Sequence, residues 1–167
     1  KMLHLVHAWA SEQNILLGQV KTEEKSNKIT AIPELIALLD LAGSIVTIDA
    51  MGCQQEIAKN IIDAEAEYIL AVKDNQKSLH NQIQTAFSHK TIESTNTTEE
   101  KSHGRIETRT CRIITNLELA EETCKWKSSQ SIVEIERIRW IKGKETKEIS
   151  HYISSLKRDA AFMNQAV

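Results

Sequence analysis

The stretch IVTIDAMGCQ, residues 45–54, ends a short apolar run on an acid, Asp49. Residues 45–48 have the character of a strand buried on both faces, which is typical of a parallel strand at a sheet centre. The following residues, 53–66, place isoleucines at helical spacing. In an open α/β sheet, functional groups gather outside the carboxyl ends of the strands. Asp49 is therefore the first candidate for a functional residue.

The segments around this stretch extend the α/β pattern. Residues 68–72 predict a second buried strand that ends at Lys73, and residues 76–87 predict a helix after it. Upstream, residues 3–9 and 15–21 predict two strands with only a short turn between them, which favours an antiparallel hairpin. A helix with an apolar face is predicted between this hairpin and residue 45.

The pattern becomes β-rich after about residue 88. Residues 89–104 are polar and predict a loop or a mobile edge. Alternation of apolar and polar residues then predicts strands over 105–115, 134–141 and 148–155, and a helix begins at about 159. A break in the alternation at Glu136 predicts a bulge.

The bulk composition limits the class of protein. The chain has 167 residues and 41% hydrophobic residues, which suits one domain, or one domain with an insertion. A net charge of −2 gives no overall basic signal for nucleic acid. No apolar run approaches the roughly 20 residues that span a membrane. Three widely spaced cysteines favour a reducing, cytoplasmic location. We expect the chain to be a piece of a longer protein.

The two strand ends allow more than one chemistry. An acid at the position of Asp49 can bind Mg²⁺, which prefers oxygen ligands. The alternative is that Asp49 caps the following turn or helix. Lys73 is either a functional cation or a solvated lysine. An acid and a lysine after two central strands also occur in phosphoacceptor receiver domains, but the opening hairpin argues against that class.

Two basic clusters lie in the β-rich block. In the first, Arg105 and Arg109 share a strand face with Glu107, and Arg112 points to the other face. Such a row can contact phosphates, or can be a charged edge that prevents aggregation. The second cluster surrounds a tight turn and consists of Arg137, Arg139, Lys142, Lys144 and Lys147. It can enter a nucleic-acid groove, or it can be a charged hairpin tip.

Five blocks of the sequence, in order along nearly the whole chain, resemble insertion-sequence DDE transposases of the H-repeat-associated type. They are KSNKITAIPEL (25–35), TIDAMGCQ (47–54), AVKDNQ (71–76), HGRIE (103–107) and YISS (152–155). The resemblance implies DNA cleavage and strand transfer in the full-length protein. It also implies two Asp and one Glu that hold two divalent ions, Mg²⁺ or Mn²⁺.

The resemblance assigns roles to individual residues. Asp49 matches the second aspartate, so it is the expected catalytic and metal-binding residue. The first aspartate would precede residue 1, and the catalytic glutamate would follow Val167. Glu107 is rejected as that glutamate because it lies in a strand pattern. The expected DNA-binding residues are Lys73, Asn75, Gln76, His103, Arg105 and Arg109.

The implied fold is α/β and RNase H-like (ribonuclease H/integrase-type), a mixed sheet with flanking helices that lacks its first strand and carries a β-rich insertion. Residues 1–88 would form part of the catalytic core, 89–156 the insertion, and 157–167 the start of the next core helix. The partners would be transposon ends and target DNA, bound by a homodimer. The chain alone would be inactive. The alternative is a catalytically silent DNA-binding or assembly module.

Overall fold

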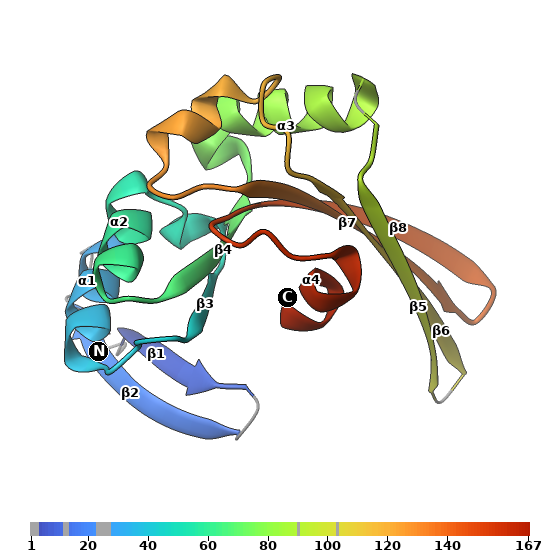
Figure 1. Cartoon of the computed structure of the whole chain (residues 1–167). Helices are drawn as coiled ribbons and strands as arrows, with labels where there is room; N and C mark the ends of the chain where they lie inside the picture. The colour runs from blue at the N-terminus through green and yellow to red at the C-terminus, as the bar shows by residue number, and fades with distance from the viewer. Residues whose placement is uncertain (1–3, 12–13, 23–27, 90, 103) are drawn as a thin grey trace.

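The computed structural model describes residues 4–11, 14–22, 28–89, 91–102 and 104–167. Figure 1 shows the course of the chain. Its elements are β1 (His4–Ala10), β2 (Ile15–Thr22), α1 (Lys28–Leu38), β3 (Ile45–Ile48), η1 (Ala50–Gly52), α2 (Gln55–Asp63), β4 (Glu67–Val72), η2 (Asp74–Gln76), α3 (Lys77–His89), β5 (Ser94–Ser102), β6 (Arg105–Ile114), η3 (Glu121–Lys125), β7 (Ser131–Ile141), β8 (Lys144–Ser154) and α4 (Ala160–Ala166).

The strands form two sheets. Six strands make one mixed sheet in the order β3-β4-β8-β7-β6-β5, in which β3 and β4 are parallel and the other neighbours antiparallel. The second sheet is the antiparallel hairpin β1–β2. A mixed α/β sheet with flanking helices and an opening hairpin was predicted from the sequence, and both predictions are confirmed. Because β8 pairs with β4, the later strands continue the same sheet.

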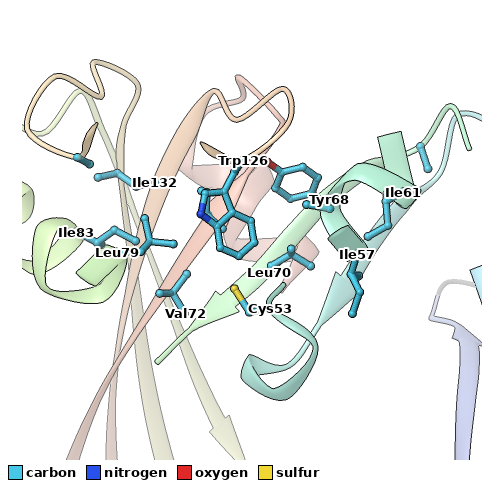
Figure 2. Packing of buried hydrophobic residues seen from close by; sticks show 14 of the residues in the cluster. Cys53, Ile57, Ile61, Tyr68, Leu70, Val72, Leu79, Ile83, Trp126 and Ile132 are labelled. Carbon is cyan, nitrogen blue, oxygen red and sulfur yellow. The ribbon is translucent and has the colours of Figure 1, made fainter. Parts of the chain in front are cut away.

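Helices cover both faces of the large sheet (Figure 1). Apolar side chains of α1, α2 and α3 form one buried cluster with Leu70 of β4 and Ile132 of β7. Figure 2 shows this cluster, with Trp126 from the segment after η3 filling its centre. On the other face, Met163 of α4 packs over Cys111 and Ile135. The far ends of β5 to β8 extend beyond the helices (Figure 1).

One prediction for the β-rich block is wrong in part, and another is wrong. Residues 89–104 were predicted to be a loop or a mobile edge; residues 94–102 are not a loop but a strand, β5, which lies at the edge of the sheet and pairs with β6 along its whole length. Its polar composition hid it, but β5 is an edge strand with mostly exposed side chains, and its threonines favour β structure. The bulge predicted at Glu136 is absent from this part of the described chain, because β7 keeps a continuous register with both neighbours.

The prediction that residues 45–48 form a central buried strand is also wrong in part. The strand and its parallel partner are confirmed. However, among the described strands β3 pairs only with β4, so it lies at an edge of the large sheet. Its side chains alternate in exposure, and Ile45 is 38% exposed. Asp49, directly after the carboxyl end of β3, is exposed.

No helix within the described ranges is long and apolar enough to cross a membrane.

Candidate functional site

Asp49 lies directly after β3 and begins the short helix η1. Its backbone is extended, with φ −67° and ψ 171°, and its side chain is exposed. The carboxylate makes no capping hydrogen bond to η1. The alternative that Asp49 serves as a side-chain cap is therefore unsupported, and its oxygens remain available to an external ligand.

Close packing fixes the η1 turn that carries Asp49. The amide of Gly52 donates a hydrogen bond to the carbonyl of Asp49 at 3.1 Å. A Cβ on Gly52 would lie 2.3 Å from Cγ2 of Ile48 and 2.8 Å from Cδ1 of Ile32, so only glycine fits. Cys53, the next residue, is fully buried beside Leu70 and Val72 (Figure 2). Burial raises the pKa of its thiol to about 12.

The end of β4 is tied to the same turn. The side-chain amide of Asn75 in η2 donates to the carbonyl of Ala50 at 2.5 Å. That of Gln76 donates to the carbonyl of Cys53 at 2.9 Å. Lys73, which precedes η2, is exposed and extended and makes no capping bond. The structure therefore brings together four predicted site residues, from Asp49 to Gln76, at the carboxyl ends of two parallel strands.

The described residues do not supply a complete metal site. They contain no group of three or more His, Cys, Asp or Glu side chains placed to hold one ion. Asp74, the nearest acid in sequence to Lys73, is 97% exposed and contacts His80 of α3 at 3.3 Å. Asp49 suits the role of one oxygen ligand, but the described part of the chain does not bring it the further carboxylates that two ions need.

Glu107 lies away from this turn, near the start of β6. Strands β4, β8 and β7 lie between β6 and the strand that precedes Asp49. The Glu107 carboxylate accepts a hydrogen bond from Nε of Arg139 at 2.8 Å, pairs with Nε of Arg137 at 3.2 Å, and is bonded by Arg105. The bond from Arg139, assisted by Arg105, lowers the pKa of Glu107 against the opposing effect of burial.

The predicted arginines of β6 have different surroundings. Arg105 bonds to Glu107 and keeps 48% of its side chain exposed. A terminal nitrogen of Arg109 donates to the carbonyl of Val167, while its Nε is buried without a hydrogen-bond partner. Burial, followed by the charge of Arg137, lowers the pKa of Arg109. His103, also predicted to bind DNA, lies outside the described residues.

No sequence pattern indicated the row of polar side chains that crosses three strands. Arg112, Glu134 and His151 are direct neighbours on β6, β7 and β8. Glu134 accepts from Arg112 at 2.7 Å and contacts His151 Nε2 at 3.1 Å, and His151 Nδ1 lies 3.2 Å from His80 of α3. Glu134 and His151 are buried. The bond to His151, then that to Arg112, lowers the pKa of Glu134.

The topology removes the receiver-like interpretation. A receiver domain alternates parallel strands and helices from its start, whereas this chain opens with an antiparallel hairpin that forms a sheet of its own.

Comparison with known proteins adds an independent result. Residues 1–162 match the family model described as "Transposase DDE domain". The chain is 42% identical over 174 residues to "Putative transposase YncI" of Escherichia coli O157:H7, covering 99% of the chain and 44% of that protein. It is 37% identical over 163 residues to "H repeat-associated putative transposase YhhI" of Escherichia coli K12, covering 92% of the chain and 43% of that protein.

The chain spans about half the length of the curated relatives it matches. Among solved structures, the piggyBac transposase synaptic complex with hairpin DNA is similar, with a TM-score of 0.50 over 95% of this chain and 28% of that one. The sequences are only 10% identical, so this likeness concerns the fold alone.

Proposed function

The chain belongs to the transposase DDE domain family and has its RNase H-like fold, and from this premise we propose that it forms part of the catalytic core of a DNA transposase. In a longer protein, like the relatives it matches, this core would cut DNA and transfer its strands by in-line attack on phosphodiesters. The substrates would be transposon ends and target DNA.

The observation that carries the proposal is the placement of Asp49. Its carboxylate is exposed at the end of β3, makes no capping bond, and stands on a turn that Gly52 packing and two amides of η2 hold in place. Such a rigid, unengaged acid suits one ligand of a two-ion site. When bound, the two ions, Mg²⁺ or Mn²⁺, activate the attacking hydroxyl and stabilise the leaving oxygen. The other carboxylates would come from outside these 167 residues.

We assign two roles to the residues beside Asp49: contact with DNA and support of the η1 turn. Lys73 is an exposed cation at the neighbouring strand end and would contact a phosphate. Asn75 and Gln76 each use an amide to hold η1, and the exposed side chain of Asn75 can also meet DNA. Arg105 and Arg109 of β6 would also contact DNA, and so would His103, which lies outside the described residues.

The proposal extends to the organisation of the protein. Residues 1–88 and 157–167 would belong to the core, and 89–156 would be an insertion whose strands continue the core sheet. The protein would act as a homodimer on DNA. Three free cysteines support a cytoplasmic location. With one carboxylate of the set, the 167-residue chain alone would bind Mg²⁺ weakly and lack strand transfer.

A strand-transfer assay on the longer protein tests the proposal. In Mg²⁺ or Mn²⁺ the wild type should join transposon ends to target DNA, and Asp49→Ala should not. DNA affinity, measured in EDTA, should be similar for both proteins because the substitution removes a metal ligand and no DNA contact. Strand transfer by the isolated 167-residue chain would contradict the proposal that the chain alone is inactive.

A further inference from the structure

Four arginines surround Glu107 on one face of the large sheet. Helix α4 covers another part of the same face, nearer the core. Arg105, Glu107 and Arg109 alternate along β6, and Arg139 and Arg137 lie directly opposite Glu107 and Arg109 on β7. All five side chains therefore project from the same face. We call the four arginines and Glu107 the arginine cluster.

Positive charge exceeds negative charge in the arginine cluster. Three guanidinium groups contact the single carboxylate of Glu107. Among the described residues, the one other acid with an ion pair to the cluster is Glu148, at 3.8 Å from Arg137 and 3.9 Å from Arg139. Arg109 has no ion pair in the described part of the chain. Glu100 of β5 lies directly opposite Glu107, so four cations share this face with three anions.

Arg109 and Arg137 add a specific electrostatic cost. Like charges directly opposite each other on neighbouring strands are destabilising. Both side chains have a buried Nε without a hydrogen-bond partner, although Nε of Arg137 lies 3.2 Å from Glu107. The charge of Arg137 also contributes to the lowered pKa of Arg109. A bound anion would offset this repulsion.

A shallow hollow lies against the cluster. It has a volume of about 430 Å³ and is lined by Glu100, Ser102, Arg105 and Glu107. A serine hydroxyl and planar guanidinium groups are suitable donors for phosphate oxygens. Glu100 would repel an anion, so the ligand should approach from the side of Arg105 and β7.

We propose that the arginine cluster binds the phosphate backbone of DNA, with Arg105, Arg137 and Arg139 as contacts and Glu107 as the positioning residue that orients them. Residues two apart on a strand lie about 7 Å from each other, so the cluster spans more than a single phosphate group and fits a continuous backbone. The inference rests on the proposed function, since it takes DNA as the ligand, and it names residues of β7 that the DNA-binding assignment did not include.

Fluorescence anisotropy tests the proposal with the 167-residue chain and a labelled DNA duplex in EDTA, over a series of salt concentrations. Arg137→Gln and Arg139→Gln should each weaken binding roughly 3- to 10-fold and reduce the slope of log affinity against log salt by about one. Lys125→Gln removes an equal charge from an exposed lysine of η3 that pairs with Glu122, and should leave affinity unchanged.

The Glu107→Gln variant distinguishes the proposed positioning role of Glu107 from the effect of net charge on DNA binding. The substitution makes the protein more positive, so unspecific attraction alone would strengthen DNA binding. Loss of the orienting carboxylate should instead weaken it. Arg139→Lys, a milder change, should also weaken binding because it keeps the charge but loses the planar group. Thermal unfolding of each variant verifies that it is folded.

The outcomes are distinct. Unchanged affinity in Arg137→Gln and Arg139→Gln, with wild type binding DNA, would overturn the cluster as a site and leave the proposed function standing. Tighter binding by Glu107→Gln would overturn its positioning role. Wild-type binding to heparin but not to duplex DNA would show that the site takes a different polyanion and would overturn the DNA assignment. Failure of wild type to bind any polyanion would contradict the cluster, whereas loss of strand transfer in the Asp49 variant would still support the proposed function.

Discussion

Gly52 allows the turn that carries Asp49 to close against Ile48 and Ile32. We expect Gly52→Ala to destabilise the protein by about 1–3 kcal/mol, because a methyl group would overlap a branched carbon of Ile48 that cannot move without shifting β3. Urea unfolding followed by circular dichroism measures the change.

Gly18→Ala is the matched control for this substitution. Its new Cβ would lie 3.3 Å from the flexible end of Leu35, so a small movement of that side chain can accommodate it. A loss of stability in Gly18→Ala that equals or exceeds that in Gly52→Ala would contradict the close-packing explanation.

The three cysteines differ in reactivity for a physical reason. Burial raises the pKa of Cys53 to about 12 and that of Cys111 to about 11, whereas Cys124 is exposed. Since the thiolate is the reactive form, we expect a thiol reagent at pH 8 to modify Cys124 alone in the folded protein, and all three after denaturation. Cys124→Ser should abolish the fast reaction. Rapid labelling of two or more thiols in the native protein would contradict this expectation.

The row formed by Arg112, Glu134 and His151 connects three strands through a buried carboxylate. Glu134→Gln should destabilise the protein at pH 7 by about 2–3 kcal/mol, because it weakens two charge-assisted bonds in a buried setting. Glu122→Gln, which breaks an exposed pair with Lys125, should cost less than about 1 kcal/mol.

The effect of pH on this row has a definite sign. The pKa of Glu134 is lowered in the folded state from its ordinary value of 4.5. The stabilisation is therefore fully present above pH 4.5 and is lost as the pH falls through the lowered folded-state pKa. Denaturant titrations from pH 7 to pH 3 should show the difference between wild type and Glu134→Gln shrinking below pH 4.5. A difference that stays constant over this range would contradict the assignment.

At the scale of elements, local patterns predicted most strands and helices and the pairing of β1 with β2, but not the strand order of the large sheet. The strand that ends at Asp49 and the strand that ends at Lys73 follow from apolar runs. Strand β5 was missed because an edge strand needs no buried face and so carries no alternation. The row at Glu134 could not be predicted, since Arg112 is 22 positions away and His80 lies 71 positions from His151. Those contacts exist only once β6, β7 and β8 are paired.

In the molecule as a whole, the two sheets differ in the number of neighbouring strands with which their strands pair. Strands β4 and β8 each pair with a neighbour on both sides, whereas the β1–β2 hairpin is a separate two-stranded sheet. Isolated two-stranded sheets are only marginally stable. We therefore expect hydrogen exchange to be slowest at the buried amides of β4 and faster in the hairpin, which should open without global unfolding. Equal protection of both sheets would contradict this difference.

Only part of the candidate site could be predicted from the sequence. The positions of Asp49 and Lys73 at strand ends were predictable because each follows an apolar run. Their place at the same edge was predictable because parallel strands have their carboxyl ends at one edge of a sheet. The hydrogen bonds from Asn75 and Gln76 to the η1 backbone were not, since they depend on how two turns meet. The sequence blocks suggested DNA contacts for both amides, and the structure gives each a bond within the protein.

The proposed role of the Asp49 carboxylate is participation in phosphoryl transfer. The most direct test is the single-turnover rate of strand transfer by the longer protein, with saturating DNA and Mg²⁺, for wild type, Asp49→Asn and Asp63→Asn. Asp63→Asn makes the same chemical change at an acid of α2 that pairs with Lys127. We expect no detectable strand transfer by Asp49→Asn and a near wild-type rate for Asp63→Asn. Strand transfer by Asp49→Asn at the wild-type rate would contradict the proposed role of Asp49.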